Sequence, residues 1–134
     1  MNIMKSTNNA LTATKIHAEQ FKGEPGLISY AIPDGITEVG ESAFEGCTNL
    51  TSITIPDSVT YIGQKAFRDC TSLTSITIPT NVTEISKCAF MRCGSLTSIT
   101  IPDSVTKIGR TAFAYCKNLT SITIRDSVTH IGYG

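Results

Sequence analysis

Apolar residues recur along this chain at a fixed interval of 23 residues. The most visible columns are those of phenylalanine and cysteine: Phe44, Phe67, Phe90 and Phe113, with Cys47, Cys70, Cys93 and Cys116. Columns of Leu, Ile, Val and Ala keep the same interval, so the unit reads A-F-x-x-C-x-x-L-x-x-I-x-I-P-x-x-V-x-x-I-G-x-x. Self-similarity at a period of 20 to 50 residues is typical of solenoids and other repeat architectures.

The second copy shows which elements one unit predicts. Residues 73–78, "LTSITI", alternate apolar and polar at their end and are rich in Thr and Ile, which favours a β-strand. The "PDSV" at 56–59 has turn chemistry, and "VTYIG" at 59–63 predicts a second short extended run. Residues 64–70, "QKAFRDC", suit about two helical turns with Ala66, Phe67 and Cys70 facing inward. One unit cannot bury its apolar face alone, so stacked units with a parallel sheet and short helical or extended segments opposite it, an α/β solenoid, are expected.

The two ends of the chain depart from the regular unit. Residues 1–10 match no repeat position and are expected to form a flexible tail before a single solenoid of residues 11–134. A degenerate cap repeat at about 16–38 has Glu24 at the cysteine position. Its core positions hold Ile16, Phe21, Leu27, Tyr30 and Ile32. The last repeat is incomplete at "VTHIGYG", so we expect an open C-terminal end that makes homo-oligomers.

Composition narrows the class of partner. Eleven basic and 11 acidic residues give zero net charge, and we expect no nucleic-acid partner because no basic cluster stands out in the sequence. No apolar run is long enough to span a bilayer, which predicts no membrane insertion. The N-terminus lacks the apolar core of a signal peptide. These features leave two readings open, a cytoplasmic chain or a piece of a longer precursor.

Residues that carry chemistry are sparse. His17 and His130 lie at opposite ends of the array, and the nucleotide-binding and zinc-protease motifs are absent, so no enzyme, no catalytic residue and no cofactor is predicted. Cysteines spaced by 23 residues do not suit zinc and are expected in the core. Cys88 stands in a polar column and is expected to be exposed, either idle or paired with another chain.

Two further patterns have ordinary explanations beside functional ones. The column Asp34, Asp57, Asp103 and Asp126 would suit calcium, but Asp after Pro also belongs in a tight turn. The sequons at Asn49, Asn81 and Asn118 are expected by chance in a chain so rich in Thr. No metal site is therefore predicted.

The L-x-x-I-x-I phrase resembles the strand of leucine-rich repeats. The 23-residue unit with A-F-x-x-C and I-P-x-x-V-x-x-I-G is similar to the BspA-like, or Treponema pallidum-type, leucine-rich repeat family over about residues 16–132. The column Gly35, Ser58, Asn81, Ser104 and Ser127 departs from the usual buried asparagine ladder. The resemblance implies a curved right-handed solenoid with its strands on the concave face. It also implies a role in adhesion to matrix proteins or host cells.

Two surfaces are candidate protein-binding sites. The concave face would carry a uniform set of hydroxyls: Thr51, Thr54, Thr74, Thr77, Thr97, Thr100, Thr120 and Thr123. Threonine also simply suits a solvated sheet, whereas the hydroxyls could act together on a repetitive ligand. The variable positions lie elsewhere: Arg68, Arg92, Tyr115, Tyr61 and Lys107. Arg and Tyr are enriched in binding hot spots, although unselected drift would give the same variation.

The leading hypothesis is a protein–protein interaction module, part of a cell-surface or secreted adhesin that binds a host or matrix protein. An intracellular leucine-rich-repeat scaffold or effector is the second hypothesis. An architectural spacer without its own ligand is the third.

Overall fold

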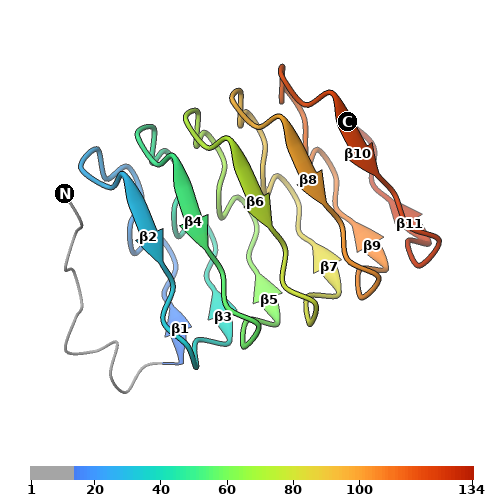
Figure 1. The fold of residues 1–134 in the computed structure, drawn as a ribbon, viewed down its shortest axis with the longest axis horizontal. Coiled ribbons are helices and arrows are strands. Elements are labelled where there is room, and N and C mark those ends of the chain that lie inside the picture. Colours follow the sequence, from blue (N-terminus) through green and yellow to red (C-terminus); the bar gives the residue numbers. More distant parts are fainter. Residues whose placement is uncertain (1–13) are drawn as a thin grey trace.

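The Ser-Ile-Thr triplet of each unit forms the longer of two strands. The computed structural model describes residues 14–134, which wind through successive coils as a parallel β-solenoid (Figure 1). The longer strands are β2 (Ser29–Ala31), β4 (Ser52–Thr54), β6 (Ser75–Thr77), β8 (Ser98–Thr100) and β10 (Ser121–Thr123). The central isoleucine points inward and the flanking hydroxyl residues are exposed in β4, β6 and β8, as the alternation predicts.

A second column of two-residue strands confirms the short extended run. These strands are β1 (Lys15–Ile16), β3 (Glu38–Val39), β5 (Tyr61–Ile62), β7 (Glu84–Ile85), β9 (Lys107–Ile108) and β11 (His130–Ile131). Paired strands are parallel and offset by one unit, so that Ser75 lies opposite Ser98 and Glu84 opposite Lys107. The 23-residue register predicted from the sequence is therefore the register of the sheets.

The prediction of two helical turns at residues 64–70 is wrong. Among residues 14–134 the structure contains strands and turns but no helix. Within the segment 64–70, Lys65 and Asp69 have left-handed backbone angles, φ 59° and 60°, which no right-handed helix tolerates. The equivalent residues of the next coil, Cys88 and Arg92, have φ 58° and 63°. The turn therefore repeats in every coil, and we call the surface formed by these stacked turns the turn face.

Hydrogen bonding explains why the turn wins over the helix. Along this segment the amides alternate between two partners. Phe67 N–H donates to the carbonyl of Ala89 in the next coil at 2.9 Å, and Asp69 N–H donates to Met91 at 2.9 Å. Arg68 N–H instead donates to the carbonyl of Lys65, three residues back, at 3.1 Å. Half of the amides thus join neighbouring coils, a role that a helix would deny them.

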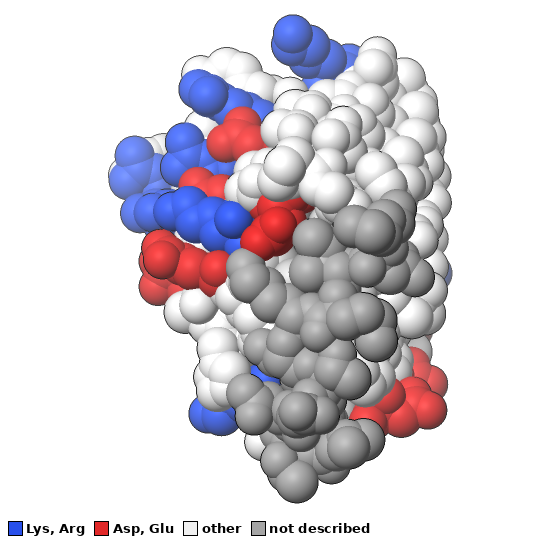
Figure 2. All heavy atoms as spheres, turned by 90° about the vertical axis from the view of Figure 1, so that its left-hand side faces the viewer, with Lys and Arg blue, Asp and Glu red and all other residues white. Residues whose placement is uncertain are grey.

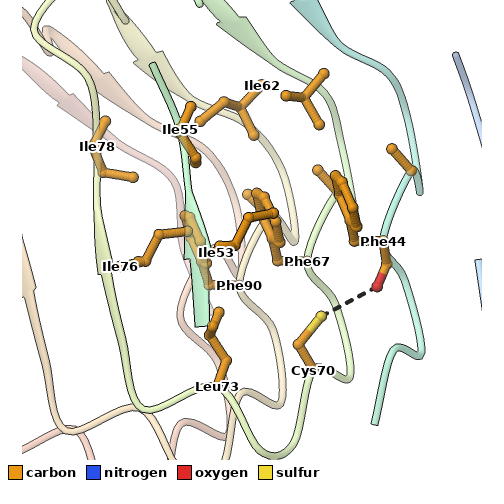
Figure 3. Close-up of a cluster of buried hydrophobic side chains, with 14 of the residues drawn as sticks. Phe44, Ile53, Ile55, Ile62, Phe67, Cys70, Leu73, Ile76, Ile78 and Phe90 are labelled. Atoms are coloured by element: carbon orange, nitrogen blue, oxygen red, sulfur yellow. Dashed lines mark hydrogen bonds between the residues drawn. The ribbon is translucent and has the colours of Figure 1, made fainter. Parts of the chain in front are cut away.

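The core is built from columns of like side chains. The rings of Phe44, Phe67 and Phe90 stack with interplanar angles of 3° and 4° and centroid separations of 5.4 and 5.5 Å (Figure 3). The Cys70 thiol donates to the carbonyl of Phe44 at 3.2 Å, and Cys93 repeats that bond to Phe67 at 3.1 Å. The cysteine column therefore packs in the core, as predicted, and also satisfies a backbone carbonyl of the preceding coil.

One joint between coils is looser than the others. In the described part of the chain, no strand pairing joins β5 to β7 or β4 to β6, although the turns beside them remain bonded. Residue 86 explains the gap between β5 and β7. The equivalent residues Gly40, Gly63, Gly109 and Gly132 are glycine, and a Cβ at Gly109 would lie 2.5 Å from the backbone nitrogen of Lys87. Ser86 carries that Cβ, and its hydroxyl rather than its amide bonds Ile62, the hydroxyl donating to the carbonyl at 2.6 Å.

The C-terminal coil is less buried than the coils before it. Ile101 is 0% exposed, whereas Ile124, one unit later, is 42% exposed, and Ile131 is 63% exposed. Strand β10 pairs only with β8, and β11 only with β9, within the described residues. The outer edges of both strands are therefore open at this end.

Candidate functional site

The predicted hydroxyl residues do form one continuous exposed surface. The eight threonines at positions 51, 54, 74, 77, 97, 100, 120 and 123 are all exposed, and we call their surface the hydroxyl face. Some of its hydroxyls serve the fold: Thr51 donates to the carbonyl of Ile28 at 3.1 Å, and Thr97 to that of Thr74 at 3.4 Å. The face offers neutral donors and acceptors in a regular array and no charged group.

The turn face differs from the hydroxyl face in charge. Its N-terminal part carries a chain of ion pairs across three coils. Lys22 lies 3.4 Å from Glu19 and 3.7 Å from Glu45. Arg68 lies 3.8 Å from Glu45 and 3.4 Å from Asp69. Figure 2 shows charged side chains gathered on one flank of the solenoid, with much of the opposite flank free of them.

Three of the five predicted variable residues come together on this turn face. Asp69, Arg92 and Tyr115 occupy one position in three successive coils, with Arg68 beside Asp69. The guanidinium of Arg92 lies over the ring of Tyr115, 5.5 Å from its centroid. A groove of about 450 Å³ runs along these coils and is lined by Asp69, Thr71, Arg92, Gly94, Tyr115 and Lys117. The structure thus joins Arg92 and Tyr115 in one concavity.

The other two predicted variable residues lie on the short strands and not in this groove. Tyr61 is in β5 and 47% exposed, and Lys107 is in β9. Lys107 lies 3.7 Å from Glu84 of the adjacent coil, and Lys15 pairs with Glu38 in the same way at 3.5 Å. These are exposed cross-strand ion pairs, which contribute little to stability.

The thiols of the buried cysteine column are protected rather than reactive. Burial raises the pKa of Cys47 to about 11 and that of Cys93 to about 12. At neutral pH both remain thiols, the form that is neither a nucleophile nor a metal ligand. Cys88 was predicted to be exposed, and this was wrong: it is 7% exposed because its sulfur packs 3.0 Å from the hydroxyl of Thr111.

The remaining chemical candidates stay apart. His17 and His130 are exposed at opposite ends of the array, in line with two surface histidines. Among the described residues no group of three or more His, Cys, Asp or Glu is placed to hold a metal ion. The asparagine of each sequon bonds the preceding coil instead; for example, the Asn118 amide donates to the carbonyl of Gly94 at 2.7 Å. Residues 14–134 contain no helix of the length and apolarity that crossing a bilayer needs.

Sequence reasoning missed part of the groove and one property of the chain. Thr71, Gly94 and Lys117 line the groove, although none of them was predicted as a variable position. The sequence feature that could have pointed to the groove is the uneven distribution of charge along the chain. Residues 14–63 carry seven Asp or Glu and two Lys, whereas residues 64–134 carry four Asp or Glu and eight Lys or Arg. Zero net charge therefore conceals an acidic half and a basic half.

Stacked parallel coils of about 20 to 29 residues, each with one strand in an L-x-x-I-x-I phrase, are typical of the leucine-rich-repeat class. The profile of the BspA type leucine rich repeat region matches residues 14–134 in six copies, and the chain belongs to that family. Leucine-rich repeats of this kind are generally protein-interaction modules.

Solved structures show the same fold. A T. pallidum leucine rich repeat protein is 29% identical, with a TM-score of 0.82 over 90% of this chain. A leucine rich cell surface protein from Faecalibacterium prausnitzii is 33% identical, with a TM-score of 0.77 over 90% of this chain. A leucine-rich repeat protein from Bacteroides ovatus is 32% identical, with a TM-score of 0.69 over 90% of this chain.

These relatives are longer than the region that is shared. The chain spans 63% of the T. pallidum protein, 30% of the F. prausnitzii protein and 39% of the B. ovatus protein. No curated protein matches the sequence.

Proposed function

We propose that this chain is the ligand-binding repeat array of a cell-surface or secreted adhesin, and that its ligand is a host or matrix protein. The observation that carries the proposal is the groove on the turn face, where Arg92 and Tyr115 meet in a concavity of about 450 Å³. Arg and Tyr are among the residues that contribute most to protein interfaces, and they do so from concave positions. The 33% identity to a protein described as a cell surface protein supports the location.

The turn face is the better candidate of the two predicted surfaces. A binding site needs a few anchors of large area or bidentate hydrogen bonding, and the hydroxyl face offers only threonine and serine over its central strands. The hydroxyl face instead suits many weak contacts, which together could hold a repetitive ligand through multivalency. A uniform face also supports the alternative of an architectural spacer.

A direct binding experiment tests the adhesin proposal. The chain is immobilised, and fibronectin and detached host-cell membranes are passed over it at micromolar concentration, with albumin as the control. Saturable binding of a matrix or membrane protein, lost on heating the chain, is the expected result. A blank response to fibronectin at micromolar concentration and to the membranes would count against adhesion and favour the scaffold or spacer.

We further propose self-association of two copies through the C-terminal edge. The open edges of β10 and β11 carry unpaired backbone groups beside the exposed Ile124 and Ile131. Such edges favour pairing with another strand. Light scattering at millimolar protein should show a dimer that dissociates on dilution. A strictly monomeric mass across that range would refute the proposal.

A further inference from the structure

The groove on the turn face differs in charge from the turns on its N-terminal side. Toward the N-terminus every charged group of the ion-pair chain has an opposite charge within 4.0 Å, including Asp69, which lies 3.4 Å from Arg68. In the part of the chain that the structure describes, Arg92 and Lys117 have no carboxylate within ion-pair distance. The groove therefore contains one neutralised carboxylate and two uncompensated cations.

The surroundings reinforce this positive potential. Residues 64–134 carry eight Lys or Arg against four Asp or Glu. Strands β7 to β11 all belong to this half. The turns that line the groove belong to it as well. A concavity with an excess of one sign of charge concentrates ligands of the opposite sign. An anionic ligand is therefore favoured over a cationic or neutral one.

Arg92 is held in a way that suits a carboxylate. Its guanidinium carbon lies over the ring of Tyr115, 5.5 Å from the centroid. In the described structure no hydrogen bond or ion pair involves the N–H donors of this guanidinium, so they are available to a ligand. Two parallel N–H donors match the two oxygens of a carboxylate. Lys117, which lines the same groove from the next coil, supplies a second cation.

We infer that the groove binds a short acidic segment of a partner protein. One Asp or Glu side chain of the segment pairs with Arg92, a second carboxylate pairs with Lys117, and an apolar side chain packs on the exposed Tyr115. This inference rests on the proposed function, because it names the chemistry of the partner that such an array would bind. The volume of about 450 Å³ suits a few residues of peptide.

The alternative anions are polymers such as nucleic acid and sulfated glycans. A polymer needs a continuous row of cations along its path. On the N-terminal side of the groove the turn face instead presents Glu45 and Asp69, both in ion pairs. A segment that ends before these carboxylates avoids them, whereas a long polyanion has to cross them.

The test uses three labelled hexapeptides, (Glu-Phe)₃, (Gln-Phe)₃ and (Lys-Phe)₃, titrated by fluorescence anisotropy in 50 mM salt. We expect (Glu-Phe)₃ to bind at least tenfold more tightly than the other two peptides. Arg92→Gln should weaken that binding about tenfold, and Arg92→Lys should do so by less. Lys117→Gln should weaken it at least threefold. The matched control is Arg110→Gln, which removes the same charge from the same half but outside the groove, and it should change binding less than twofold.

Three outcomes would overturn the inference. One is no preference for (Glu-Phe)₃ over (Gln-Phe)₃. Another is an equal loss in the Arg92→Gln and Arg110→Gln variants, which would mean unspecific attraction. The third is tighter binding of heparin or a DNA oligonucleotide than of the acidic peptide, which would assign the surface to a polyanion. The peptide assay contains no matrix protein, so it is independent of the fibronectin assay. Binding of the acidic peptide without binding of fibronectin or host-cell membranes would refute adhesion alone. Binding of fibronectin or membranes without a preference for the acidic peptide would refute the acidic ligand alone.

Discussion

The phenylalanine column allows one stability prediction to be worked out in detail. Phe67 is 0% exposed, and its ring lies between those of Phe44 and Phe90 at centroid separations of 5.4 and 5.5 Å. Phe67→Ala removes the ring and both stacking contacts. Buried Phe→Ala changes cost about 3–5 kcal/mol, and the loss is larger where the site cannot collapse into the cavity.

Collapse is hindered at this site by the backbone. The amide of Phe67 donates to Ala89 at 2.9 Å and that of Phe44 donates to Ala66 at 2.8 Å, so the turns on both sides are fixed at their present spacing. We therefore expect a loss near the upper limit, about 4–5 kcal/mol. That is a large share of the roughly 5–15 kcal/mol that stabilises a typical domain.

A matched variant sharpens the test. Phe113 makes the same contact with one neighbour, Phe90, at 5.6 Å, but its ring is only partly buried. Phe113→Ala should therefore cost about half as much, roughly 2 kcal/mol. Urea unfolding followed by circular dichroism gives both values from the midpoints if the slopes are unchanged. Equal losses in the two variants, or a loss under about 1 kcal/mol for Phe67→Ala, would refute the reasoning.

Three further predictions concern the backbone and the thiols. Gly109→Ser should destabilise the chain by about 1–3 kcal/mol, because the added side chain would open hydrogen bonds between neighbouring coils. The reverse change, Ser86→Gly, should let the amide of residue 86 bond the preceding coil and so slow its hydrogen exchange. Unchanged exchange at residue 86 would contradict this. Lys65 has a left-handed φ of 59°, which glycine adopts without strain, so Lys65→Gly should stabilise the chain by about 1 kcal/mol in urea unfolding. Lys87 does not have a left-handed φ, so Lys87→Gly should destabilise the chain. Unfolded thiols ionise near pH 9 and Cys93 near 12, so stability should fall above pH 9, by roughly 1 kcal/mol at pH 10 for this thiol. An equally steep fall in Cys93→Ala would disprove that assignment.

The sequence predicted the columns well because periodicity is a global signal. Ile76 and Ile99 are identical in residue and neighbours, so their pairing follows once the unit is recognised. The turn escaped prediction because Ala66, Phe67 and Cys70 satisfy the spacing of a helix as well as that of the turn. What separates the two is the left-handed angle at Lys65 and Asp69. Lys does not signal such an angle, and Asp, although enriched in that region, is replaced in the next coils by Arg92 and Tyr115.

The candidate site was predicted in part for a similar reason. Arg92 and Tyr115 were found as variable positions of a known column, and the groove joins them. Lys117 lies two residues further along the unit, in a column whose other members are unremarkable in the sequence. Its importance comes from its position beside Arg92 across a coil boundary. Cys88 was misplaced because a column average cannot show that Thr111 of the next coil covers one particular sulfur.

The loose joint at Ser86 has a consequence for how the solenoid would respond to mechanical load. A protein under tension along its coil axis carries the force through the bonds that link successive coils. At this joint the turn ladder is intact, but neither strand column is paired between the coils of β5 and β7 in the described structure. Fewer bonds share the load there than at the joint between β7 and β9. Extension would therefore begin at this joint and leave the coils on either side whole.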